Sequence, residues 1–193
     1  WGGGRGRVSV GSGGSVVVQV GLKACCRVYG IAGGAAKCSY LNERLGAHAA
    51  IDYKAHRDVG SLAVAVRAAC PGGVDVYFDN VGGDITDVVI AQIARRARVV
   101  ICGQISQYDG GLDAPPQGPR LLAHMLYQRA TIQGILARDY IARMDEMRRI
   151  VAPWVKAGEI VLPETIVEGF EQLPEALGSL SEGANLGKLL VRA

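Results

Sequence analysis

Short β-branched segments alternate with longer amphipathic segments along the first hundred residues, and glycine or proline separates most of them. This alternation is typical of an α/β protein whose strands run parallel and are joined by right-handed helical crossovers. The nearly continuous apolar strand at residues 99–101 favours a sheet with helices on both faces. The sequence therefore predicts a Rossmann-type, doubly wound parallel sheet.

The first five strands are expected near residues 8–10, 27–31, 49–53, 74–78 and 98–102. Helices are expected at residues 15–24, 35–45, 59–70 and 85–94, and in the first of them Val16, Val17 and Val20 are predicted to face the core. A loop rich in proline and glycine follows at residues 104–120. The later elements are expected as helices at 121–128, 140–156 and 174–180, strands at 131–136 and 188–191, and an extended segment at 160–167.

Composition excludes several classes of function. Twenty-one basic and 18 acidic residues give a net charge of +3 and no basic cluster, so nucleic-acid binding is not expected. No run of about 18 apolar residues predicts a membrane span, and no secretory signal is visible. The five cysteines have no zinc-site spacing, so we expect free thiols, no metal and a cytoplasmic location.

Glycines follow the first predicted strand. Gly11, Ser12, Gly13 and Gly14 stand before the first helix, where backbone N–H groups could approach a pyrophosphate. The match to the dinucleotide-binding pattern is incomplete, because Ser9 occupies the place of the first glycine. A flexible glycine linker is the alternative interpretation of this segment.

The end of the second predicted strand indicates which coenzyme is used. Residues 31–37 contain no carboxylate of the kind that binds the ribose 2′-hydroxyl of NAD. Lys37 offers a cation for a 2′-phosphate beside the small Gly33–Gly34 turn, which favours NADP over NAD. The alternative is that Lys37 is an ordinary solvated helix residue.

The ends of the fourth and fifth predicted strands carry small or polar residues. Asn80 offers a donor and an acceptor, and Cys102 and Gly103 end the next strand. Ligands of open parallel sheets bind beyond the carboxyl ends of the strands, so these positions are candidates for cofactor binding. A purely geometric turn at residues 79–80 is the alternative.

Three segments resemble one known family. Residues 74–83 (VDVYFDNVGG), 100–108 (VICGQISQY) and 183–191 (GANLGKLLV) are similar to the zinc-free medium-chain dehydrogenase/reductases. Within this superfamily the sequence resembles the prostaglandin reductase, alkenal double-bond reductase and curcumin reductase family.

The resemblance implies where NADP(H) binds. Gly11, Ser12, Gly13 and Gly14 would hold its pyrophosphate and Lys37 its 2′-phosphate. The other cofactor-binding positions that it implies are Tyr53, Asn80, Cys102, Gly103, Ser106, Tyr108, Ile135, Leu136 and Asn185. A tyrosine implicated in catalysis in some members falls on Tyr127, for which a packing role is the alternative.

The implied reaction is NADPH-dependent reduction of a carbon–carbon double bond conjugated to a carbonyl, in small enals and enones. Family members begin with a GroES-like substrate domain, so we expect this chain to be a fragment that lacks it. The expected division is a flexible start at residues 1–7, an NADP-binding Rossmann domain at 8–156, and C-terminal elements of the substrate domain at 157–193.

The resemblance also implies a homodimer through the sixth strand, although Gln133 and Gly134 interrupt its apolar run. Two other functions remain open. One is an inactive nucleotide-binding or oligomerisation module, and the other is an NADPH quinone reductase.

Overall fold

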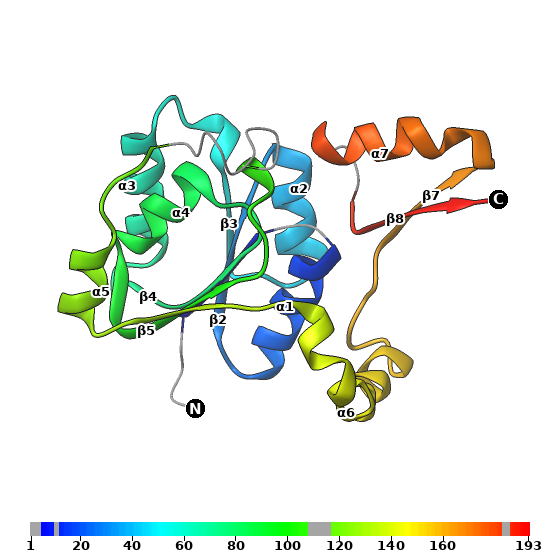
Figure 1. Ribbon diagram of the computed structural model, residues 1–193, viewed down its shortest axis with the longest axis horizontal. Coiled ribbons are helices and arrows are strands. Elements are labelled where there is room, and N and C mark those ends of the chain that lie inside the picture. The colour runs from blue at the N-terminus through cyan, green and yellow to red at the C-terminus, as the bar shows by residue number, and fades with distance from the viewer. Residues whose placement is uncertain (1–4, 10–11, 108–116, 183–185) are drawn as a thin grey trace.

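A six-stranded parallel sheet, with the order β3-β2-β1-β4-β5-β6, forms the centre of the protein (Figure 1). The structure is a computed structural model, which describes residues 5–9, 12–107, 117–182 and 186–193. The strands are β1 Arg5–Ser9, β2 Arg27–Ala32, β3 Ala49–Asp52, β4 Val74–Asp79, β5 Ile93–Ile101 and β6 Thr131–Gly134. The strand order reverses between β1 and β4, which confirms the predicted doubly wound sheet.

Helices cover both faces of this sheet (Figure 1). One side carries α3 Val59–Ala69, α4 Gly83–Ile90 and α5 Leu122–Gln128. The other side carries α1 Ser12–Lys23, α2 Ala35–Ser39 with the π-helical turn η1 Tyr40–Arg44, and α6 Met144–Lys156. The short 3₁₀ turns are η2 Tyr53–Ala55, η3 Ile105–Gln107, η4 Ala137–Arg143 and η5 Phe170–Gln172.

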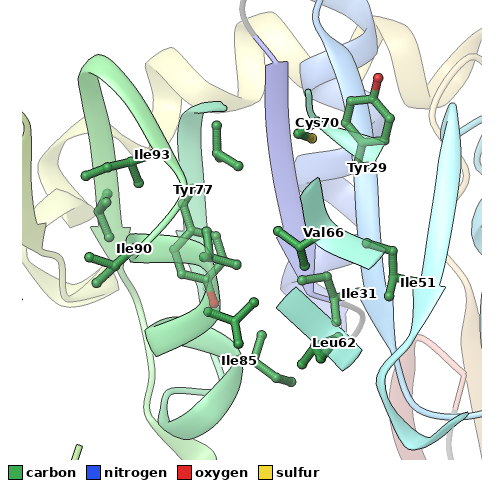
Figure 2. Close-up of a cluster of buried hydrophobic side chains, with 14 of the residues drawn as sticks. Tyr29, Ile31, Ile51, Leu62, Val66, Cys70, Tyr77, Ile85, Ile90 and Ile93 are labelled. Carbon is green, nitrogen blue, oxygen red and sulfur yellow. The ribbon is translucent and has the colours of Figure 1, made fainter. Parts of the chain in front are cut away.

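Alternate side chains of β2 point to opposite faces of the sheet and belong to two separate hydrophobic cores. Tyr29 and Ile31 belong to the larger cluster, which packs against α3 and α4 and is drawn in Figure 2. Val28 and Ala32 belong to the smaller cluster, which packs against α1 and η1. Each fully buried aliphatic side chain contributes about 1.5–3 kcal/mol. Burial on both faces explains why this strand reads as a continuous apolar segment.

Several predicted boundaries are wrong. The helix expected at residues 140–156 begins at Met144, after the turn η4, and three further differences concern the main sheet and α1. Strand β1 begins at Arg5 rather than residue 8, because its backbone pairs with β2 from Arg5 onward and with β4 from Gly6. Strand β5 begins at Ile93 rather than residue 98. Its first part contains Arg96 in a left-handed conformation, and its pairing with β4 shifts register there. Helix α1 begins at Ser12, so the predicted glycine turn contributes its first helical turn.

The buried face of α1 also differs from the prediction. Val18, Ser15 and Gln19 are its buried side chains, and Val16 and Val20 are half-buried. Val17 is half-buried too, but it packs against the smaller core as predicted. Gln19 is buried because its side chain pairs with the backbone of a distant segment. Its Nε2 donates to the carbonyl of Val161 at 2.8 Å, and its Oε1 accepts from the N–H of Val161 at 2.7 Å.

The remaining elements come after Val161 in the chain. They are β7 Glu164–Glu168, α7 Leu173–Glu182 and β8 Lys188–Arg192, and the two strands pair in parallel as a small separate sheet. Figure 1 shows them beyond the side of the main sheet that carries α1 and α2. Lys23 reinforces the attachment, because it forms an ion pair with Glu159 and lies 5.9 Å from the ring centre of Trp154.

Within the described ranges, we find no helix that is both long enough and apolar enough to span a bilayer.

Candidate functional site

The carboxyl ends of the parallel strands form one edge of the main sheet, which we call the rim. The register places Asp79 beside Ile101, and Ile101 beside Gly134. On the other half of the sheet, Ala32 lies beside Asp52. Neighbouring strands are about 4.8 Å apart, so the ends of β2 and β4, with β1 between them, are separated by about 10 Å. The rim is therefore long enough for an extended ligand such as a dinucleotide.

The loops that follow β4 and β5 bind each other through their backbones. The N–H groups of Cys102 and Gly103 donate to the carbonyl of Asp79, at 2.8 and 3.2 Å. Ile105 N–H donates to the carbonyl of Asn80 at 3.2 Å, and Ser106 donates from its N–H and its hydroxyl to the carbonyl of Val81. These bonds bring the predicted residues Asn80, Cys102, Gly103 and Ser106 together.

Asp79 organises this pair of loops through its side chain. Its carboxylate is fully buried and accepts five hydrogen bonds. Oδ1 accepts from the Tyr77 hydroxyl and from the N–H groups of Val81 and Gly82, at 2.9–3.0 Å. Oδ2 accepts from the Thr86 hydroxyl at 2.6 Å and from Nε2 of Gln104 at 2.9 Å. A buried charge of this kind is tolerated because hydrogen bonds satisfy its oxygens.

The turn after β2 meets the residues that follow β3. A Cβ atom built on Gly33 would lie 2.9 Å from Cε of Lys54 and 3.0 Å from the Tyr53 hydroxyl, so both side chains cover this turn. Asp52 holds the arrangement, because its Oδ1 accepts from the N–H of Gly34 at 2.7 Å and from the N–H of Lys54 at 3.0 Å. The predicted residues Lys37 and Tyr53 thus lie at the same corner of the rim.

The two lysines of this corner outnumber its one carboxylate, that of Asp52, so its net charge is positive. Burial lowers the pKa of Lys37 from its ordinary 10.5, and the nearby charge of Lys54 lowers it further. Burial raises the pKa of the neighbouring Cys38 thiol, and the charge of Asp52 adds to that effect. Neither lysine forms an ion pair within the part of the chain that the structure describes. The corner is suited to an anionic group.

The start of α1 supplies a second feature suited to an anion. Ser12, Gly13 and Gly14 form its first turn, and the first backbone N–H groups of a helix have no partner within the helix. A helix N-terminus of this kind favours phosphate groups. Gly11 lies outside the described residues, as do Tyr108 and Asn185.

The predicted positions after β6 also lie at the rim. Ile135 N–H donates to the carbonyl of Ile101 at 2.9 Å, which continues the pairing of β6 with β5. Ile135 is half-buried and Leu136 is 50% exposed. The backbone of these two apolar residues therefore follows β6 at the edge where Cys102 and Gly103 follow β5.

Tyr127 is the predicted site residue that the structure does not bring to the rim. It lies in the last turn of α5, just before β6 begins at Thr131, and its side chain is 75% exposed. The rim lies at the other end of β6, at Gly134.

Sequence reasoning missed three residues of this edge. The sequence indicates Asp79 only as part of a turn, and it indicates no role for Gln104 or Lys54. The signal for Asp79 was its place at the end of a buried strand, where a carboxylate needs donors. In the described ranges, no three His, Cys, Asp or Glu side chains are placed to hold a metal ion.

Comparison with known proteins identifies relatives of this chain. The family model described as zinc-binding dehydrogenase matches residues 14–154. The chain is 38% identical over 183 residues to the NADPH-dependent curcumin reductase of Escherichia coli, covering 93% of this chain and 52% of that protein. It is also 38% identical over 187 residues to prostaglandin reductase 1 of Rattus norvegicus, covering 96% of this chain and 55% of that protein.

A solved structure is similar over nearly the whole chain. The crystal structure of CurA in complex with NADPH from Vibrio vulnificus superimposes with a TM-score of 0.90 at 37% identity, covering 99% of this chain and 57% of that one. The present chain thus spans about half the length of the relatives that it matches.

Proposed function

The chain belongs to the zinc-binding dehydrogenase family of the medium-chain dehydrogenase/reductases, and on that premise we propose that it is the cofactor-binding half of an NADPH-dependent enone and enal reductase. The names of the E. coli and rat relatives, and the NADPH in the Vibrio CurA crystal, support this proposal. The proposed enzyme needs no zinc.

The observation that carries the proposal is the cationic corner at Gly33. Lys37 and Lys54 stand there without an acid partner among the described residues, and the Tyr53 hydroxyl covers the same turn. In this part of a Rossmann sheet, an acid is typical of NAD binding and a cation of NADP binding. The residues present fit a 2′-phosphate, and Lys37 would hold it.

The rest of the rim accommodates the remainder of the cofactor in this proposal. The first turn of α1 would receive the pyrophosphate, since α1 follows β1, beside which the strand order reverses. Asn80, Gly103 and Ser106 would contact adenine and ribose, on loops that Asp79 holds together. Ile135 and Leu136 would lie beside the nicotinamide and keep water from it.

When bound, NADPH would supply a hydride to the β-carbon of the unsaturated carbonyl compound, and the α-carbon would take a proton from water. Negative charge develops on the carbonyl oxygen between these two steps, and the protein must direct a hydrogen-bond donor to that position. Tyr127 is not assigned this role, because it lies at the end of β6 remote from the rim. The role of the present chain is to fix the nicotinamide ring relative to the substrate.

Steady-state oxidation of NADPH, followed by its absorbance, tests this function. We expect the enzyme in which this chain is joined to a substrate-binding half to oxidise NADPH with 2-nonenal and not with nonanal, which lacks the double bond. Oxidation with a quinone but not with 2-nonenal would favour a quinone reductase. Calorimetric binding of NADPH without oxidation by any acceptor would favour a nucleotide-binding module.

A further inference from the structure

The second lysine of the cationic corner has no assigned role, although its backbone is held firmly. Lys54 lies in η2, directly after β3, and its N–H donates to Oδ1 of Asp52 at 3.0 Å. The same carboxylate oxygen accepts the N–H of Gly34, in the turn that leads to Lys37. Asp52 therefore fixes Lys54 against the turn between β2 and α2.

The side chain of Lys54 lies across this turn rather than extending away from it. Its Cε would be 2.9 Å from a Cβ atom at position 33, and the Tyr53 hydroxyl would be 3.0 Å away. The glycine thus leaves room for Tyr53 and Lys54 to cover the same backbone. A β-carbon at this position would displace both groups.

Lys54 and Lys37 form a pair of like charges. The charge of Lys54 contributes to the lowered pKa of Lys37. In the described part of the chain, no carboxylate forms an ion pair with either ammonium group, and the Tyr53 hydroxyl has no hydrogen-bond partner. Two adjacent cations repel each other, and an anion with two negative charges would relieve that repulsion.

We infer that Lys54 is a second phosphate-binding cation, which acts with Lys37 and the Tyr53 hydroxyl to select a cofactor with a 2′-phosphate. This inference rests on the proposed function, since it assigns a further residue to the same cofactor. A phosphate monoester carries up to two charges and three acceptor oxygens. The ammonium groups of Lys37 and Lys54 match its two negative charges. Together with the Tyr53 hydroxyl, they provide three donor groups for its three oxygens.

Isothermal titration calorimetry with Lys54→Met separates this role from simple packing. Methionine keeps an unbranched apolar side chain over Gly33 and removes the charge. The probes are adenosine 2′,5′-bisphosphate and NADPH, with AMP and NADH as partners that lack the 2′-phosphate. We expect Lys54→Met to bind adenosine 2′,5′-bisphosphate and NADPH about tenfold more weakly, which corresponds to about 1.4 kcal/mol. Its binding of AMP and NADH should be unchanged.

Two further variants complete the test. Lys54→Arg keeps the charge and should retain most of the preference for the 2′-phosphate, whereas Lys54→Gln should behave as Lys54→Met. Lys156→Met, at the exposed end of α6, is the matched control and should bind all four ligands as the original chain does.

Equal weakening of all four ligands by Lys54→Met, or no weakening of any, would overturn the role of Lys54 and leave the proposed function intact. Failure of the unaltered chain to bind NADPH and the bisphosphate would overturn both the cofactor site and the role of Lys54.

Discussion

Gln104 donates a hydrogen bond from Nε2 to Oδ2 of Asp79 at 2.9 Å, which joins the segment after β5 to the end of β4. The same Nε2 also donates to the carbonyl of Gly103 at 2.9 Å. Because Asp79 holds the N–H groups of Val81 and Gly82 as well, one buried carboxylate sets the shape of both loops. The central part of the proposed cofactor site therefore depends on a side chain that we do not expect to touch the cofactor.

Replacing Asp79 by Asn tests this dependence. The amide nitrogen would face donors where a carboxylate oxygen now accepts, and buried donors would lose their partners. We expect a loss of about 3 kcal/mol in the free energy of unfolding, measured with urea. Asp84→Asn, on an exposed residue of the first turn of α4, is the control and should change stability little. Similar values for the two variants would contradict the role of Asp79.

Gly82→Ala tests the contact between the two loops. Gly82 has a φ of +75°, which is costly for other residues, and a Cβ atom there would overlap the side-chain amide of Gln104. We expect weaker binding of both NADPH and NADH, because the loop geometry serves the part that they share. Gly178→Ala, where an added Cβ meets nothing within 4 Å, should leave calorimetric affinities unchanged. Full affinity in Gly82→Ala would show that the loops need not be held in this way.

Gln19→Ala tests the attachment of the C-terminal segment. The substitution removes both hydrogen bonds to the backbone of Val161 and leaves its N–H without this acceptor. We expect a loss of about 2 kcal/mol in thermal or urea unfolding. Limited proteolysis should also cut sooner near residues 157–163. Gln133→Ala, on an exposed side chain of β6, is the control. Unchanged proteolysis in Gln19→Ala would exclude an anchoring role.

The preference for NADPH over NADH should depend on pH in a defined direction. Burial, and then the charge of Lys54, lowers the pKa of Lys37, so its charge is lost as pH rises through that lowered value. The phosphate gains its second charge near pH 6. The ratio of the two dissociation constants should therefore favour NADPH most strongly between these limits. Calorimetric measurement of both dissociation constants across the pH range tests whether the preference for NADPH has this maximum.

Lys54→Met provides the internal control for that pH dependence. Removing the second charge raises the pKa of Lys37 again, although the larger effect of burial remains. The decline at high pH should therefore move to higher pH in this variant. A decline that stays in place or moves to lower pH would show that Lys37 and Lys54 are not coupled in this way.

The sheet and much of its rim could be predicted from the sequence because they depend on local patterns. Short apolar strands, glycine punctuation and polar residues at strand ends placed Asn80, Gly103 and Lys37 on one edge, as the structure has them. The start of β1 could not be predicted in this way. It is determined by pairing with β2 and β4, and the arginines in the segment argue against a strand.

Other features depend on partners far apart in the chain. Asp79 meets Gln104, 25 residues later, and Gln19 meets Val161, 142 residues later, so no local pattern indicates either contact. The position of Tyr127 follows from the direction of α5 relative to β6. The family resemblance implied a catalytic tyrosine there, whereas topology places it away from the rim.

Hydrogen exchange with and without saturating NADPH tests most directly whether the rim holds the cofactor. We predict slower exchange at residues 33–37, 53–55, 80–83 and 102–107, all of which follow the carboxyl ends of strands. Exchange at the opposite edge, in residues 70–73 and 128–130, should not change. Protection confined to that opposite edge, or no protection at the rim when the cofactor is bound, would contradict the account.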